Sequence, residues 1–178
     1  MSRILGAILA GGESRRFGAD KAEALLGGRT LIEHAERAIA RQVDATIIVG
    51  RGPIGDRPHA GLGPLGGLNA ALHHARAHGL ELVASIGCDT PVLPADLVER
   101  LHGAGAPCYL AAMPIIGLWP SALADRLDAH LARGPSRSMR SWAEAVGAAP
   151  VTLDIAIANI NTPADLAAII AAHERHRA

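Results

Sequence analysis

Residues 4–21 read Ile4-Leu5-Gly6-Ala7-Ile8-Leu9-Ala10-Gly11-Gly12-Glu13-Ser14-Arg15-Arg16-Phe17-Gly18-Ala19-Asp20-Lys21, and this stretch decides the fold. Its apolar residues run on rather than alternate, which predicts a strand buried on both faces of a parallel sheet. Gly11 and Gly12 free the backbone that follows, so that consecutive N–H groups can curl around an anion. Arg15, Arg16 and Lys21 add the positive charge that binding of a triphosphate needs. Because open α/β sheets bind ligands where strands end, the stretch predicts a nucleotide site.

The loop after this strand differs from a Walker A loop. No Gly-Lys-Ser or Gly-Lys-Thr follows the glycines, and Lys21 stands too far from them. The sequence therefore predicts that the phosphates are held in another way.

Length and composition bound the class of protein. A chain of 178 residues predicts one α/β domain over residues 1–178. Hydrophobic residues make up 49% and aromatic residues 2%, so we expect an aliphatic core. The 17 Lys and Arg residues balance the 17 Asp and Glu residues, and there is one Phe and one Tyr. Neither a global positive field nor base-stacking platforms are available, which argues against nucleic-acid binding.

Cysteine usage and hydropathy indicate the compartment. Cys88 and Cys108 lack CxxC spacing and a disulfide framework, which suits a reducing cytosol. The first apolar run is too short to span a bilayer and lacks the features of a signal peptide. We expect a cytoplasmic protein with no membrane partner.

Alternating strand and helix patterns follow the first loop. Thr30 and Glu33 form a predicted capping box for a helix over 31–41, and the strand that follows implies a right-handed parallel crossover. The remaining predicted strands are 46–49, 82–86, 108–111, 115–119 and 151–153, and the remaining predicted helices are 68–78, 94–101, 120–132, 138–146 and 163–175.

Residues 50–67 form a predicted loop rich in glycine and proline. Gly61, Gly63 and Gly66 match the dinucleotide fingerprint, but no strand precedes them, so we reject that interpretation. A loop of this length in a small domain is typical of a ligand-covering segment. In the helix that follows, His73, His74 and His78 are interpreted as a solvated face without metal-ligand spacing.

Two later segments carry polar side chains beside predicted strands. Asp89 follows a buried strand, where a carboxylate near phosphates can hold Mg²⁺, whereas the residue taken alone slightly favours a turn or helix-cap role before Pro91. Asn159 and Asn161 stand one residue apart on an extended segment and therefore point the same way. Because sheet interiors seldom place polar side chains so, we expect both to face a ligand.

Four motifs together resemble the molybdenum cofactor guanylyltransferases. They are Leu9-Ala10-Gly11-Gly12-x-Ser14-x-Arg16-Phe17-Gly18-x-Asp20-Lys21, Gly63-Pro64-Leu65-Gly66-Gly67, Cys88-Asp89-Thr90-Pro91 and Asn159-x-Asn161-Thr162-Pro163. The resemblance covers nearly the whole chain, and the motifs stand in the family's order. It implies a single-domain three-layer α/β/α sandwich with a mostly parallel, Rossmann-like sheet of the glycosyltransferase-A type.

The resemblance also implies roles for single residues in GTP binding. The backbone of Leu9, Ala10 and Gly11, with Gly12 beside it, would bind GTP, and Lys21 would contact its phosphates.

Asp56 and Gly66 would belong to the nucleotide site as well, and Arg16 would join Lys21 as a catalytic charge. Asp89 would be the Mg²⁺ ligand, and Asn159 and Asn161 would contact the metal region or the pterin.

The sequence departs from the family's pattern at three places. Gly50 stands where the family often has asparagine, so a side-chain contact is lost there. The chain is also shorter than the family's pattern between Gly50 and Asp56, and again between Ala111 and Pro114.

The implied reaction is attack by a molybdopterin phosphate oxygen on the α-phosphorus of GTP with Mg²⁺ present, releasing pyrophosphate. Transient contact with cofactor-delivery proteins or molybdoenzymes would follow from that role. Three alternatives stay open. They are a CTP-using transferase acting on molybdopterin or a sugar phosphate, a non-catalytic nucleotide- or cofactor-binding module, and a nicotinamide-dependent oxidoreductase.

Overall fold

The computed structural model describes residues 2–11, 24–134, 136–154, 157–160, 162, 164–165 and 167–169. Its strands are β1 (Ile4–Leu9), β2 (Leu25–Leu26), β3 (Arg29–Thr30), β4 (Ala45–Val49), β5 (Leu82–Gly87), β6 (Cys108–Leu110), β7 (Met113–Pro120) and β8 (Ala149–Val151). Its helices are α1 (Leu31–Ala40), α2 (Pro64–Ala77), α3 (Leu97–Ala104), α4 (Ala124–Arg133) and α5 (Met139–Val146), with a 3-10 turn at Ser121–Leu123.

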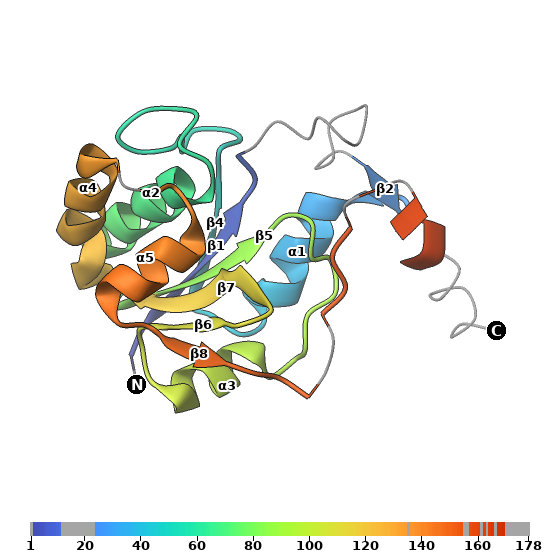
Figure 1. Cartoon of the computed structure of the whole chain (residues 1–178). Coiled ribbons are helices and arrows are strands. Elements are labelled where there is room, and N and C mark those ends of the chain that lie inside the picture. Colours follow the sequence, from blue (N-terminus) through green and yellow to red (C-terminus); the bar gives the residue numbers. More distant parts are fainter. Residues whose placement is uncertain are drawn as a thin grey trace.

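A six-stranded sheet in the order β4-β1-β5-β7-β6-β8 forms the centre of the described chain (Figure 1). β1 pairs in parallel with β4 and β5, and β8 pairs in parallel with β6. β7 runs antiparallel to both of its neighbours. The mostly parallel sheet confirms the predicted fold class.

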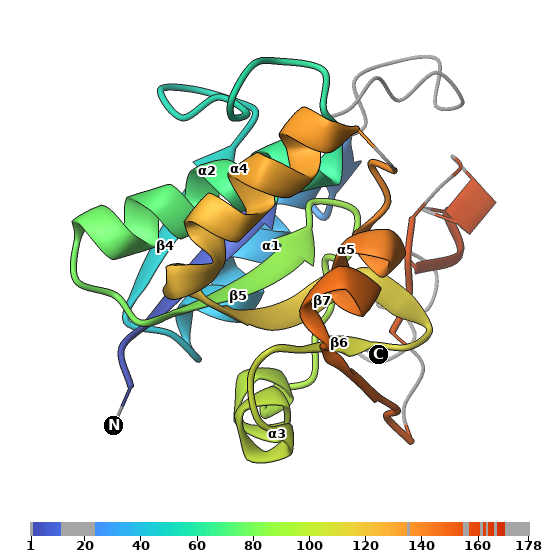
Figure 2. The same cartoon turned by 60° about the vertical axis from the view of Figure 1, so that its left-hand side comes forward.

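Helices cover both faces of the sheet. Successive residues of a strand point to opposite sides, so the continuous apolar run of β1 presents hydrophobic side chains to both faces. On one face, Leu5, Ala7 and Leu9 of β1 pack in a cluster with residues of α2, α4 and α5. On the other face, Ile8 packs with residues of α1 and α3. Figures 1 and 2 show these two helical layers on either side of the strands, as a three-layer sandwich requires.

The core is less purely aliphatic than composition suggests. Trp119 and Trp142 are the largest of the fully buried side chains. The Trp119 Nε1–H donates to Ser85 Oγ at 2.9 Å, and the Ser85 hydroxyl donates to the Ile115 carbonyl at 2.7 Å. Two of the few aromatic residues are therefore buried between the sheet and its helices.

Helix starts were the least accurate predictions. The Thr30–Glu33 capping box is confirmed at α1, and Ser138 caps α5 by accepting from the Ser141 N–H. However, α2 begins at Pro64 rather than at residue 68, and α3 begins at Leu97 rather than at residue 94. Proline suits the first turn of a helix because its missing N–H is not needed there, which extends α2 toward the loop before it.

Two further boundaries also shift. β8 spans Ala149–Val151, two residues earlier than predicted, and α4 begins at Ala124 rather than at residue 120, since β7 extends to Pro120. Thr162 and Asp165 form a reciprocal cap, with the Thr162 N–H 2.8 Å from Asp165 Oδ2 and the Asp165 N–H 3.2 Å from Thr162 Oγ1. This confirms the predicted N-cap of the C-terminal helix. Among the described residues, no helix has the length and apolar character needed to cross a bilayer.

Candidate active site

A cleft of about 730 Å³ opens where the parallel strands β1 and β4 end. It is lined by Ala10, Gly11, Gly50, Arg51, Gly55, Asp56, Ala60, Gly61 and Gly63. Hydrogen bonds hold its base together, because the Ala10 N–H donates to the Val49 carbonyl at 2.9 Å and the Gly50 N–H donates to Ile54 at 2.9 Å. The volume is in the range of small-molecule sites.

Loop 50–63 supplies most of the lining and has no regular secondary structure. The absence of a strand before Gly61 confirms that the dinucleotide fingerprint does not apply here. The loop is tied to α2, since the Arg57 N–H donates to the Gly66 carbonyl at 3.0 Å. The loop therefore lines the cleft, and its role in covering a ligand stays a prediction.

Asp56 is the carboxylate of this cleft. Its Oδ1 atom is buried and has no hydrogen-bond partner among the described residues. Burial raises the pKa of Asp56, while the Gly61 N–H opposes the rise. Glycines leave room for the side chain, because a Cβ at Gly11 would lie 3.2 Å from Asp56 Oδ1 and a Cβ at Gly66 would lie 2.9 Å from Asp56 Cβ.

Gly50 explains one departure from the family's pattern. Its φ is +89°, and a Cβ at this position would lie 2.5 Å from the Gly11 Cα and N atoms. The two strand ends therefore meet backbone to backbone, and a side chain such as asparagine has no room at position 50. The sequence indicated a lost contact but not this close approach.

A second group of polar atoms lies beside the end of β5. Asp89 follows Gly87, and its Oδ1 would collide with any Cβ placed on Gly87. The turn is fixed by Thr90, whose buried hydroxyl donates to the Gly87 carbonyl at 2.7 Å. The helix-cap alternative for Asp89 is not what the structure shows, since α3 begins eight residues later at Leu97.

The C-terminal segment packs directly on this turn. The Ile160 N–H donates to the Asp89 carbonyl at 2.9 Å, and Ile160 is fully buried against Leu26 and Leu31. Asn159 Oδ1 is buried and has no hydrogen-bond partner within the described ranges. The structure therefore brings Asp89 and Asn159 together, although 70 residues separate them in the sequence.

The end of β1 lies between the Asp56 cleft and the Asp89 turn. Leu9 pairs with Val49 on one side and with Gly87 on the other, and its carbonyl accepts from the Cys88 N–H at 3.4 Å. The backbone of Leu9, Ala10 and Gly11 thus runs between the Asp56 cleft and the Asp89 turn. Of the predicted site residues, Gly12, Arg16, Lys21 and Asn161 lie outside the described residues.

The histidines of α2 need a correction. His73 is half-buried, and its Nε2 lies 2.9 Å from Asp128 Oδ2 of α4, so it does not belong to a merely solvated face. No local pattern indicates this pair, because the partner stands 55 residues away in the sequence. His74 and His78 stack on each other with ring centroids 4.1 Å apart.

Strand pairing and a side-chain hydrogen bond hold the short turn between β6 and β7 in place. Leu110 pairs with Met113 across the two residues Ala111 and Ala112. The Arg140 guanidinium donates to the Ala111 carbonyl at 3.1 Å and so anchors the turn to α5. The chain closes here as a tight hairpin where the family's pattern is longer.

Comparison with known proteins agrees with this geometry. Residues 6–149 match the MobA-like NTP transferase domain. A molybdenum cofactor guanylyltransferase from Rhodobacter capsulatus is 41% identical, over 93% of this chain and 94% of that protein. A protein of the same description from Acidiphilium cryptum is 36% identical, over 93% of each chain.

Solved structures share the fold at lower identity. Molybdopterin-guanine dinucleotide biosynthesis protein A from Archaeoglobus fulgidus superposes with a TM-score of 0.78 at 24% identity, over 96% of this chain and 99% of that one. The 2-C-methyl-D-erythritol 4-phosphate cytidylyltransferase from Thermus thermophilus gives 0.66 at 17% identity, over 98% and 100%. The chain therefore belongs to the molybdenum cofactor guanylyltransferase family of MobA-like NTP transferases, and it is an enzyme of the nucleotidyltransferase class.

Proposed function

We propose that the chain transfers GMP from GTP to the terminal phosphate of molybdopterin and releases pyrophosphate. The descriptions of its relatives support a GTP-using transferase of molybdenum cofactor biosynthesis. The fold alone does not choose the base, because cytidylyltransferases share it. Our assignment of guanine as the base rests on the buried Oδ1 of Asp56 in the cleft, which has no hydrogen-bond partner among the described residues.

A carboxylate at this place suits guanine. Guanine offers two adjacent donors on one edge, the N1–H and the 2-amino group, and a carboxylate accepts two parallel hydrogen bonds. Adenine, cytosine and uracil do not offer two neighbouring donor groups on one edge. A buried acceptor without a partner costs free energy, so a ligand that supplies N–H donors to Asp56 recovers it.

The residues around Asp89 suit Mg²⁺. This ion prefers oxygen ligands, and it binds through one or two carboxylates together with phosphates and water. The Asp89 carboxylate and the unpartnered amide oxygen of Asn159 are such donors. When bound, Mg²⁺ would neutralise charge on the phosphate oxygens.

The chain's own contribution is positioning and charge stabilisation. The cofactor phosphate forms a new P–O bond to the α-phosphorus while the bond to the pyrophosphate oxygen breaks in line. A phosphate is already an ionised nucleophile, so no side chain needs to remove a proton from it. The Leu9–Gly11 backbone would orient the nucleotide, and Arg16 and Lys21 would offset charge on the departing pyrophosphate.

Pyrophosphate release from GTP, CTP, ATP and UTP, each with Mg²⁺ and molybdopterin, tests the proposal. We expect release from GTP, and we expect Asp56→Asn to reduce the preference for GTP over the other nucleotides. Release mainly from CTP would keep the reaction and overturn the base assignment. GTP binding without release would favour a non-catalytic binding module.

A further inference from the structure

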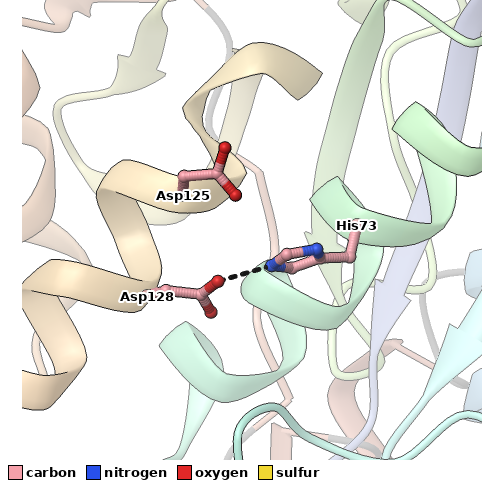
Figure 3. Close-up of side chains that lie close together, drawn as sticks. All are labelled: His73, Asp125 and Asp128. Atoms are coloured by element: carbon pink, nitrogen blue, oxygen red, sulfur yellow. Dashed lines mark hydrogen bonds and ion pairs between the residues drawn. The ribbon is translucent and has the colours of Figure 1, made fainter.

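A cluster of polar side chains joins α2 to α4, apart from the nucleotide cleft. Asn69, His73 and Arg76 stand on one face of α2, and Asp125 and Asp128 face them from α4. Figure 3 shows the His73 ring directed at Asp128, with the Asp125 carboxylate nearby. His73 stands ten residues after Gly63, which lines the cleft, and this corresponds to about 15 Å along the helix axis.

The contacts in this cluster indicate which ring nitrogen of His73 carries the proton. Asn69 Nδ2 donates to Asp128 Oδ1 at 2.6 Å, and His73 Nε2 lies 2.9 Å from Asp128 Oδ2. Arg76 holds Asp125 with two hydrogen bonds of 2.8 and 3.0 Å, and its Nη2 lies 3.3 Å from His73 Nδ1. An arginine N–H can only donate, so Nδ1 accepts and Nε2 carries the imidazole proton.

The side chain of Asn69 also lies in the cluster. The residue is fully buried, its Nδ2 donates to Asp128, and its Oδ1 has no hydrogen-bond partner among the described residues. A 180° turn of the amide would exchange the two atoms and place Oδ1 beside Asp128, where a cation between the two oxygens would replace the hydrogen bond that the turn removes.

The carboxylates of the cluster outnumber its guanidinium. Asp125 and Asp128 both face the α2 side chains, and the only guanidinium that bonds to either of them in the described contacts, that of Arg76, holds Asp125. A cation would therefore meet one more carboxylate than Arg76 pairs with.

We propose that His73, Asp125 and Asp128, with the Asn69 amide oxygen, form a site for a divalent transition-metal ion such as Zn²⁺. One ligand atom from each of His73, Asp125 and Asp128 lies within 4.8 Å of the others, so small side-chain movements would bring all three around one ion. Imidazole nitrogen together with carboxylate oxygen suits Zn²⁺ and Co²⁺ better than Mg²⁺. The site is distinct from the Asp89 region and does not depend on the proposed reaction.

Metal binding must compete with Arg76. An ion on Nε2 moves the remaining imidazole proton to Nδ1, where it would face the Arg76 N–H, donor against donor. The guanidinium would also have to release Asp125. Arg76 is 42% exposed, so it can swing into solvent. The ion would then clamp α2, whose first residues border the cleft, onto α4.

Titration of the nucleotide-free protein with Co²⁺, followed by visible absorption, and thermal melts with Zn²⁺ test this site. We expect a Co²⁺ spectrum of nitrogen and oxygen coordination, and a melting temperature that rises with Zn²⁺ by mass action. His73→Gln and Asp128→Asn should weaken binding at least about tenfold. Arg76→Met, an exposed change, should tighten it because it removes the competing cation.

A control variant separates this site from its neighbours. The double variant His74→Gln/His78→Gln removes the adjacent stacked pair and should bind as the wild type does. The proposal is overturned if the wild type binds neither ion, if binding disappears only with the His74/His78 pair, or if Arg76→Met weakens binding. The last outcome would show an ion-pair network that needs its arginine.

Discussion

Gly50 and Gly11 are in backbone contact at the nucleotide cleft, and a Cβ atom on Gly50 would lie 2.5 Å from the Cα of Gly11. This contact brings the ends of β4 and β1 together under the cleft. The close approach of the two strand ends at the cleft therefore requires a residue without a side chain at position 50.

Gly50→Ala should destabilise the protein and weaken GTP binding. Overpacking of a tight contact costs about 1–3 kcal/mol, and left-handed backbone adds a further cost for alanine. Gly52→Ala is the matched control, because Gly52 has a φ of +86° but nothing within 4 Å of an added Cβ. Urea unfolding and nucleotide titration of both variants measure the difference. Equal losses in the two variants would show that the contact with Gly11 does not matter.

The sequence predicted the local features of this fold well. The continuous apolar run of β1 and the Thr30 cap are local signals, since one short segment or two residues carry each of them. Asp89 and Asn159 were each predicted to face a ligand, because each follows or occupies an extended segment. Their proximity, however, depends on the Ile160–Asp89 hydrogen bond, which no local pattern contains.

Long-range relationships account for what the sequence missed. The contact of Gly50 with Gly11 follows from strand register, and the His73–Asp128 pair follows from the packing of α4 on α2. The antiparallel direction of β7 was likewise not predicted, because periodicity identifies a strand but not its direction.

Ser85→Ala should lower the free energy of unfolding by about 1–3 kcal/mol, the cost of an unsatisfied buried polar group. It leaves the Trp119 Nε1–H without its acceptor and removes the hydroxyl donor to Ile115. Thermal and urea unfolding measure the loss. The double variant Ser85→Ala/Trp119→Phe removes the orphaned N–H as well, so the two changes should be less than additive. Full additivity would contradict the proposed hydrogen bond.

Asp89→Asn should reduce turnover about 100-fold or more, as expected for the loss of one electrostatic stabiliser. Removal of divalent metal by a chelator should abolish turnover of the wild type. Asp96→Asn is the matched control, because Asp96 pairs only with surface residue Arg100 in the described contacts, at 2.8 Å. Single-turnover pyrophosphate release measures the effect. A near-normal rate in Asp89→Asn would contradict its role as a metal ligand.

The raised pKa of Asp56 predicts how GTP affinity depends on pH. Hydrogen bonds to guanine need the ionised carboxylate, so binding should weaken as the pH falls through the folded pKa, which burial places above the ordinary value of 3.8. Without nucleotide, Asp56 makes the stability of the protein change with pH in the opposite direction. Its pKa is higher in the folded than in the unfolded state, so the folded state takes up the proton first, and the contribution of Asp56 to the free energy of unfolding rises as the pH falls.

Asp56→Asn separates this effect from titration of the GTP phosphates. The ratio of the dissociation constants of variant and wild type cancels changes in the nucleotide itself. We expect that ratio to be large at neutral pH and to shrink toward acid pH, as wild-type Asp56 becomes neutral like asparagine. Fluorescence titration of a labelled GTP across this range measures it. A ratio that stays constant with pH would show that Asp56 does not accept hydrogen bonds from the base.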